Sequence, residues 1–173
     1  MQNFIEYIFQ DWQANQDTSS KSRFVLVMFR SAQLICRLPA PISTIYKFLY
    51  QFIVEWIMGI ELPYDTQIGK NLKLIHGIAL VVNHHTIIGE NCTLRHATTI
   101  GNKQLADGSP SAAPKIGDRV DIGSNVVMIG DITIGDRAVI GAGSVVVKDV
   151  AANTIVAGNP AKVLKVLETA TVT

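Results

Sequence analysis

Four histidines are the residues of this 173-residue chain whose chemistry is easiest to name. An imidazole changes its charge near neutral pH, so it is the natural side chain for taking a proton from a hydroxyl group. An adjacent pair of histidines can also bind a metal ion, but no third ligand stands near the pair here, so we expect no metal site. The four residues are His76, the pair His84 and His85, and His96.

Several classes of protein are excluded by the composition. The two cysteines, Cys36 and Cys92, lie far apart without a Cys-x-x-Cys motif, which argues against a disulfide scaffold or a zinc site and favours a reduced, cytoplasmic setting. A net charge of +1 with scattered charges gives no reason to expect a nucleic-acid partner. The glycine-rich motifs that bind nucleotide phosphates are missing as well.

An array of six-residue repeats must position the histidines. Between residues 116 and 146 every sixth residue is aliphatic, and glycine follows most of these residues directly. A helix would repeat its apolar face every three to four residues and a plain strand every two. A period of six is typical of a parallel β-helix, in which each aliphatic side chain points inward and stacks on its counterpart in the next coil. The six residues are Ile116, Ile122, Met128, Ile134, Ile140 and Val146.

The same period extends back to Ile68, with two insertions. A step of eight from Leu80 to Ile88 places two of the histidines in a two-residue insertion. A step of sixteen from Ile100 to Ile116 makes residues 102–114 a polar loop that leaves the coil. Insertions in repeat proteins often lie on the binding face. Twelve hexads, three to a turn, predict about four turns. Residues 153–166 are expected to cap the array as an extended segment with a short helix.

The first third of the chain is predicted to be helical. Apolar residues at spacings of three and four indicate helices over residues 3–14, 21–37 and 42–58, the last ending at Gly59. We therefore expect a helical region at 1–58, a β-helix domain at 59–167 and a tail at 168–173. The expected core stripe of the second helix is Phe24, Val27, Met28, Ala32 and Ile35.

The third predicted helix is the most apolar part of the chain. It contains Lys47 and Glu55, whereas a membrane-spanning helix needs about 20 nearly uncharged residues. We interpret it as amphipathic or buried, with contact to a membrane surface as the alternative. The N-terminus carries no basic segment of the kind that begins a secretory signal, so we expect a cytoplasmic protein, or one at the inner face of the membrane.

Four segments of the chain resemble the hexapeptide-repeat acyltransferases. They are GIELPYDTQIGKNLKLIHG at 59–77, TLRHATTIGN at 93–102, PKIGDRVDIGSNVVMIGDITIGDRAVIGAGSVVVKDV at 114–150 and AGNPAKV at 157–163. The resemblance implies a left-handed parallel β-helix and acyl transfer from acetyl-CoA. Within the superfamily the chain is similar to the serine acetyltransferase branch. It looks closer to the colanic acid and capsule polysaccharide O-acetyltransferases, because its helical region is short and Ala113 stands where serine acetyltransferases carry a second histidine.

The resemblance also implies roles for particular residues. His76, which the repeat places at a corner of the coil beside Gly77, matches the family's catalytic base. Glu61 matches the acidic residue, usually aspartate, that orients this imidazole and stabilises its charged form. We expect the acceptor to be bound by His96, Arg95 and Asn102.

Coenzyme A needs an extended groove with room for its pantetheine arm, and the family places it against two glycine-containing stretches near the C-terminus. A flat-sided solenoid is expected to form a cyclic oligomer, and the resemblance makes this a homotrimer with its active sites between subunits. The residues expected to bind the cofactor are Ala142, Gly143, Ser144, Gly158, Asn159, Pro160 and Lys162.

Three functions are compatible with these residues. The first is O-acetylation of a sugar hydroxyl in exopolysaccharide or capsule assembly, which the short helical region and Ala113 favour. The second is a serine O-acetyltransferase of cysteine biosynthesis, against which the absent second histidine argues. The third is a scaffold without enzymatic activity, since a solenoid can be purely structural.

Overall fold

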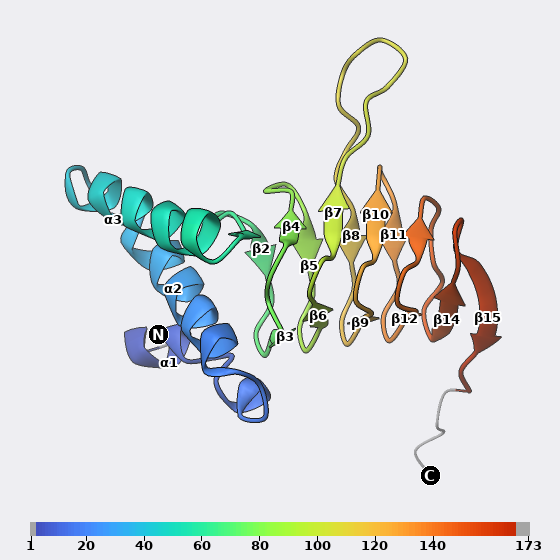
Figure 1. Ribbon diagram of the computed structural model, residues 1–173, viewed down its shortest axis with the longest axis horizontal. Helices are drawn as coiled ribbons and strands as arrows, with labels where there is room; N and C mark the ends of the chain where they lie inside the picture. Colours follow the sequence, from blue (N-terminus) through green and yellow to red (C-terminus); the bar gives the residue numbers. More distant parts are fainter. Residues whose placement is uncertain (1–2, 169–173) are drawn as a thin grey trace.

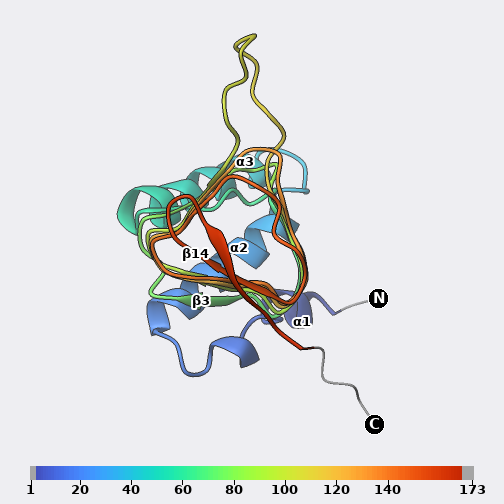
Figure 2. The same cartoon turned by 90° about the vertical axis from the view of Figure 1, so that its right-hand side faces the viewer.

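The computed structural model, which describes residues 3–168, consists of a helical region packed against one end of a three-sided β-helix (Figure 1). Seen along its axis, the β-helix has a triangular outline, and one long loop leaves it at a corner (Figure 2). Strands of successive coils pair in parallel to form three sheets. The structure therefore confirms a mainly β fold wound from hexapeptide coils.

The chain visits the three sheets in the fixed order A, B, C, and we name each corner by the two sheets that it joins. Five strands stacked in sheet A give about five turns, where the sequence predicted four, because the first coil already begins at Ile60. Sheet A contains β1 (Ile60–Glu61), β4 (Leu80–Val82), β7 (Thr99–Gly101), β10 (Val127–Ile129) and β13 (Val145–Val146). Sheet B contains β2 (Gln67–Ile68), β5 (Ile87–Ile88), β8 (Lys115–Ile116) and β11 (Thr133–Ile134). Sheet C contains β3 (Lys73–Ile75), β6 (Thr93–Arg95), β9 (Asp121–Ile122), β12 (Val139–Ile140), β14 (Thr154–Ala157) and β15 (Lys162–Val166).

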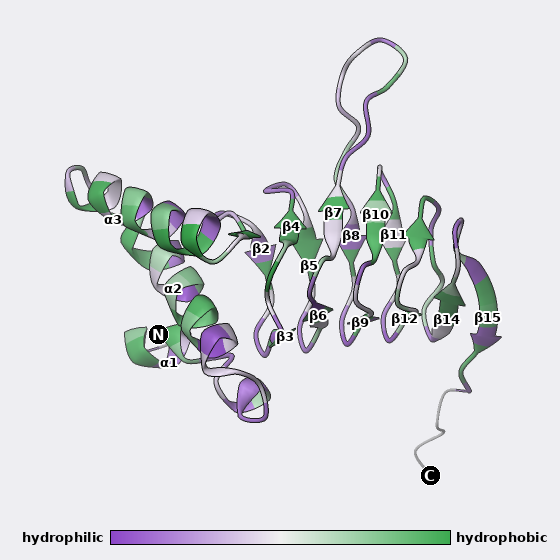
Figure 3. Cartoon of the chain, viewed as in Figure 1, coloured by the Kyte–Doolittle hydropathy of each residue, from purple (hydrophilic) through white to green (hydrophobic). Residues whose placement is uncertain are grey.

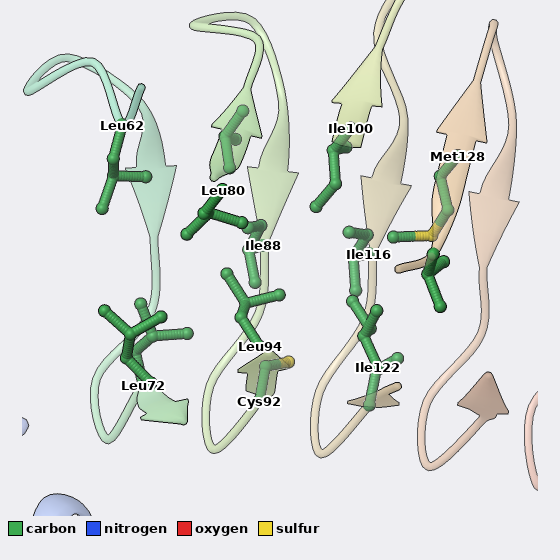
Figure 4. Packing of buried hydrophobic residues seen from close by; sticks show 14 of the residues in the cluster. Leu62, Leu72, Leu80, Ile88, Cys92, Leu94, Ile100, Ile116, Ile122 and Met128 are labelled. Atoms are coloured by element: carbon green, nitrogen blue, oxygen red, sulfur yellow. The ribbon is translucent and has the colours of Figure 1, made fainter. Parts of the chain in front are cut away.

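The core of the β-helix is made of the repeated aliphatic residues, stacked in columns along its axis (Figure 4). In sheet A, strand pairing places Met128 directly between Ile100 and Val146. Burial of one such side chain stabilises the fold by about 1.5–3 kcal/mol. Glycines beside the columns allow the coils to approach: a Cβ on Gly123 would lie 2.5 Å from the backbone nitrogen of Ala142.

The predicted position of the first insertion was wrong. Strand pairing sets Leu80 opposite Ile60, and Val82 opposite Ile100, so Val82 rather than Leu80 continues the column. The step of eight therefore runs from Leu74 to Val82. The two extra residues lie in the corner that contains His76, and not beside the adjacent histidine pair. The six-residue pattern pointed to Leu80 because Leu80 is buried as well. Leu80 and Val82 are the two inward-facing residues of β4.

The second insertion is confirmed, since residues 102–114 leave the coil between β7 and β8 and project from the A–B corner (Figures 1 and 2). The end of the array differs from the prediction. No short helix forms there; β15 instead turns back antiparallel on β14 and closes the open edge of sheet C. The predicted tail at 168–173 lies, except for its first residue, outside the described residues.

The helical region differs from the prediction mainly in its first helix. Helix α1 (Phe4–Ile8) stops after five residues and is followed by a short 3-10 turn, η1 (Gln13–Asn15). The chain turns there because Asp11 is directed inward, where it accepts hydrogen bonds from the Arg30 side chain and from the backbone nitrogen of Leu72. The second predicted helix is confirmed as α2 (Ser20–Ile35), with Ser19 as its N-cap.

The predicted core stripe of α2 was wrong, apart from Ala32 and from Met28, which is half-buried against the core. Phe24 is 43 % exposed, and the buried face is rotated towards Ser22, Val25 and Phe29. The rotation brings Arg30 onto the buried face, where its guanidinium donates to the carbonyl oxygens of β2 and the turn after it. A hydrophobic pattern assigns a charged residue to the exposed face of a helix. Because Arg30 is buried, the predicted core stripe of α2 was misplaced by one position.

The third predicted helix forms α3 (Ile42–Tyr50), which continues directly into a π-helix, η2 (Gln51–Ile57). It ends at Gly59 as predicted, with φ at 64°. Its outer face is apolar (Figure 3). Among residues 3–168, no helix is long and apolar enough to cross a bilayer.

Candidate active site

The C–A corner repeats one backbone feature in every coil. A single residue there adopts the left-handed conformation, and the column consists of Gly59, Ala79, Ala97, Asn125 and Gly143, with φ between 52° and 71°. Backbone hydrogen bonds tie each corner to the next: the nitrogen of Ala97 donates to Ile78, and the nitrogen of Asn125 donates to His96. The column is a straight edge along the β-helix, and the candidate site lies on it.

His76 is the exception on this edge. Its φ is 53°, and among described non-glycine residues it alone is left-handed outside the two regular corner columns. The two-residue insertion produces this conformation, and it leaves the imidazole exposed. A non-glycine residue in this region costs about 1–3 kcal/mol, and such strain is concentrated at functional sites. The fold thus holds His76 out from the corner at an energetic cost.

His96 lies one coil further along the same edge, facing His76. The two rings meet edge to face with their centroids 6.0 Å apart. The Nδ1 atom of His96 is buried and has no hydrogen-bond partner among the described residues. Arg95 beside it is already engaged, since it forms an ion pair with Asp121 and donates to the carbonyl oxygen of Ile122 at 2.9 Å. Two imidazoles, one exposed and one partly buried, are the candidate reactive groups of this edge.

Two carboxylates lie at the base of the edge. Glu61 ends β1, the strand directly below β4, and points outward from sheet A. Glu55 lies in η2, and its backbone oxygen accepts a hydrogen bond from Gly59, the first residue of the corner column. Partial burial and the nearby charge of Glu61 raise the pKa of Glu55. The sequence offered no reason to place Glu55 near the histidines, because a carboxylate within a predicted helix does not indicate which part of the β-helix lies beside it.

The stretches predicted to bind the cofactor meet at the far end of the same edge. The backbone nitrogen of Val145 donates to Gly158 at 2.9 Å, and the nitrogen of Gly158 donates to the Ser144 hydroxyl at 3.2 Å. Ala142 and Gly143 are exposed beside them, as are Asn159, Pro160 and Lys162. With coils about 4.8 Å apart, this cluster lies roughly 14 Å from the corner of His76. An extended arm laid along the edge would span that distance.

Asn102 is not brought to His76 within one chain. It follows β7 at the A–B corner, and the width of sheet A separates it from the C–A corner.

A cavity of about 520 Å³ lies away from the histidine edge. It is formed between the helices and sheet B, and it is lined by Tyr7, Arg37 and Tyr64 among others. Among residues 3–168, no group of three or more histidine, cysteine or acidic side chains could hold a metal ion.

Gly77 fixes the position of the His76 corner. A Cβ on Gly77 would lie 2.6 Å from Cδ2 and 2.9 Å from Cγ of Leu74, which is fully buried in the core. We expect Gly77→Ala to displace the corner and lower the rate of acetyl transfer about 10- to 100-fold, since small misplacements of a reacting group are costly. A rate assay with acetyl-CoA, together with a melting curve, checks this. Lys70→Ala, exposed on the B–C corner, is the control; equal losses in both variants would contradict the assignment.

A β-helix wound from hexapeptide coils, with two histidines on one edge, points to a class, the hexapeptide-repeat acyltransferases. Comparison with known proteins supports it. The family described as "Bacterial transferase hexapeptide (six repeats)" matches residues 113–148. WcaB of Escherichia coli K12, assigned as a colanic acid biosynthesis acetyltransferase, is 42 % identical over 115 residues, covering 66 % of this chain and 69 % of that protein. The chain belongs to the hexapeptide-repeat acetyltransferases and is an acyl-CoA-dependent enzyme.

Serine acetyltransferases are also similar to the chain. Serine acetyltransferase 2 of Arabidopsis thaliana is 37 % identical over 115 residues, which cover 66 % of this chain and 35 % of that protein. The serine acetyltransferase of Neisseria gonorrhoeae superposes with a TM-score of 0.78 at 27 % identity, over 96 % of this chain and 67 % of that one. The Brucella abortus enzyme in complex with coenzyme A gives a TM-score of 0.80 at 25 % identity, over 95 % and 69 %. These relatives are left-handed β-helix proteins, and the chain has this fold.

Proposed function

We propose that the chain transfers an acetyl group from acetyl-CoA to a hydroxyl of a sugar in exopolysaccharide or capsule synthesis. The observation that carries the chemistry is the strained, exposed His76 facing His96 on the edge that ends at the exposed backbone of Gly143 and Gly158. The β-helix, residues 59–167, is proposed as the catalytic domain, and residues 1–58 as a helical region that closes its end.

In the proposed mechanism, His76 is the general base. Its imidazole takes the proton of the acceptor hydroxyl while the oxygen attacks the thioester carbonyl, and the proton then passes to the departing thiolate of coenzyme A. Glu61 stabilises the transient imidazolium through its negative charge at the base of the edge. The coenzyme arm lies along the C–A corner, where the exposed backbone around Gly143 and Gly158 leaves room for it. Lys162 is proposed to contact its phosphates.

The sugar acceptor is favoured by two observations. WcaB is more similar in sequence than Serine acetyltransferase 2, at 42 % against 37 % identity over equal lengths. Ala113, at the position where serine acetyltransferases carry a histidine, is 5 % exposed and offers no polar group to a substrate. A serine acceptor remains the second candidate, since solved relatives with a similar fold include serine acetyltransferases, one in complex with serine.

An acceptor screen tests the proposal. We expect thiol release from acetyl-CoA to be fast with sugar or lipid-linked glycan acceptors and close to background with L-serine. Release that is faster with L-serine than with any glycan would overturn the choice of acceptor. A protein that binds coenzyme A but acetylates neither a glycan nor L-serine would overturn both candidate functions.

Glu61→Gln tests the proposed role of the carboxylate. The variant keeps the shape and removes the charge, so we expect kcat to fall about 10- to 100-fold, with little change in the KM for acetyl-CoA, because the imidazolium loses its stabilising partner. Steady-state kinetics provide the measurement. Glu90→Gln, on the opposite B–C corner, is the matched control and should behave as wild type.

A further inference from the structure

The cavity of about 520 Å³ between the helices and sheet B has no role in the mechanism proposed for His76. It is lined by β2 and β5, by residues at the C-terminal end of α2, by Tyr7 of α1 and by Tyr64 of the A–B corner. Its volume lies in the range of small-molecule sites, about 300–1,000 Å³. In a three-sided coil, sheet B lies opposite the C–A corner, so the width of the β-helix separates the cavity from His76 (Figure 2).

One wall of the cavity is fixed by hydrogen bonds. The Gln33 side chain donates to the carbonyl oxygen of Thr66 at 3.1 Å, and its own oxygen accepts from Tyr7 at 2.8 Å and from Arg30 at 3.0 Å. Arg30 is held in turn by its ion pair with Asp11. Little of this wall has to become ordered when a ligand enters, which lowers the cost of binding.

Other polar groups of the cavity are free to bind a ligand. Within the part of the chain that the structure describes, the exposed side chains of Arg37 and Asp65 form no ion pair with each other or with any other residue. The hydroxyl of Thr66, which is fully buried, has no hydrogen-bond partner among the same residues. Arg37 offers only donors, Asp65 only acceptors, and Thr66 both. These groups surround the apolar side chain of Ile87, which is 39 % exposed.

This combination of groups favours one class of ligand. A free anion such as phosphate would meet the carboxylate of Asp65, and an apolar ligand would bury Arg37 and Asp65 without partners. A sugar ring suits the cavity better, because each hydroxyl can both donate and accept a hydrogen bond, and the C–H groups of the ring can lie against Ile87 and Tyr64.

We propose that the cavity binds a sugar residue of the glycan acceptor, remote from the hydroxyl that His76 activates. The cavity thereby selects an acceptor that is longer than one sugar. The link to the acceptor rests on the proposed acetyl transfer, whereas the binding of a sugar in the cavity rests on the geometry of the cavity alone. The two parts are therefore tested separately.

The thiol of Cys36 lines the same cavity and reports on its occupancy, since it is free and half-buried. Burial raises the pKa of Cys36, so labelling with N-ethylmaleimide is followed at mildly alkaline pH by intact-mass spectrometry. Cys92, the other cysteine, is fully buried and should stay unlabelled. D-galactose, D-glucose, D-glucuronate and their disaccharides are the probes. At about ten times its Kd, a bound sugar should slow the labelling about tenfold, because only the free protein reacts.

Two aspartate variants show whether the protection comes from this cavity. Asp65→Ala should lose the protection, and Asp131→Ala, exposed further along the A–B corner, should keep it. Failure of every sugar to protect Cys36, or full protection in Asp65→Ala, would overturn the sugar site. Protection by inorganic phosphate or by cyclohexanol in place of the sugars would overturn it as well, because it would show a site for anions or for apolar molecules.

Steady-state kinetics test the link to the acceptor. With a polymeric glycan, Asp65→Ala and Arg37→Ala should each raise the KM for the acceptor about 10-fold and leave kcat and the KM for acetyl-CoA unchanged, because only remote binding is lost. With a monosaccharide acceptor both variants should match the wild type. Protection of Cys36 by a sugar without acetylation of any glycan would leave the sugar site standing and refute the proposed acetyl transfer. Acetylation of the polymer with an unchanged KM in both variants would refute the role of the cavity in binding the acceptor.

Discussion

Replacement of His76 by alanine is expected to lower the kcat for acetyl transfer by about 10²–10⁴-fold, the usual contribution of a positioned general base. The reason is geometric as well as chemical. His76 is the one described non-glycine residue that is left-handed outside the regular corner columns, so the fold maintains a strained conformation in order to expose this imidazole. Steady-state thiol release with the acceptor found by screening provides the measurement.

The control for this variant must separate lost chemistry from relieved strain. Asn91 has the same left-handed conformation, with φ at 58°, and it is exposed on the B–C corner, away from the histidines. Asn91→Ala should therefore retain wild-type kinetics, and His76→Asn, which tolerates the backbone conformation, should be as inactive as His76→Ala. Full activity in His76→Asn would rule out the imidazole as the base.

Loss of the buried ion pair between Asp11 and Arg30 is expected to have the largest effect on stability. Both side chains are at most 2 % exposed, and Arg30 Nε donates to Asp11 at 2.7 Å. Arg30 also donates to the carbonyl oxygens of Ile68 and Gly69, at 2.9 Å and 2.6 Å. Asp11 in turn accepts from the backbone nitrogen of Leu72 at 2.9 Å. The pair thus joins the helical region to the first coil.

Asp11→Ala leaves the Arg30 charge buried without its partner, so it should lower the free energy of unfolding by about 3–5 kcal/mol. Urea unfolding followed by circular dichroism provides the measurement. Asp17→Ala is the matched control: its carboxylate pairs with Lys73 at 2.6 Å but is 69 % exposed, so a change below about 1 kcal/mol is expected. Similar losses in both variants would show that the buried pair is not what holds the two parts together.

The exposed ion pair between Asp17 and Lys73 contributes little to the attachment of the helical region to the β-helix. The sheet edge of the first coil is covered by short polar side chains of the helical region. Asn15 donates to the carbonyl oxygen of Leu72 and accepts from the backbone nitrogen of Leu74. It thereby satisfies backbone groups that a sheet edge would otherwise leave open to pairing with other chains. The helical region is therefore an end cap of the β-helix.

What the sequence determined by itself is the β-helix, because its physical cause is local and repeated. An aliphatic residue every six positions has one way to be buried in every coil, so Ile116, Ile122 and Met128 predict their own columns. The position of the long loop followed from the same count, since residues 102–114 cannot fit a hexad. The family resemblance could be identified for the same reason, because the motifs lie in segments whose structure is fixed by their neighbours in the chain.

What only the tertiary structure decided is register and pairing between distant segments. The pattern could not show that Leu80 and Val82 are both buried, and strand pairing was needed to place the insertion at His76. Likewise, the core face of α2 depends on Arg30 finding a carboxylate 19 positions earlier and carbonyl groups nearly 40 positions later. Contacts between residues so far apart leave no periodic trace in a sequence, since each is made once and by polar groups that a hydrophobic pattern assigns to the surface.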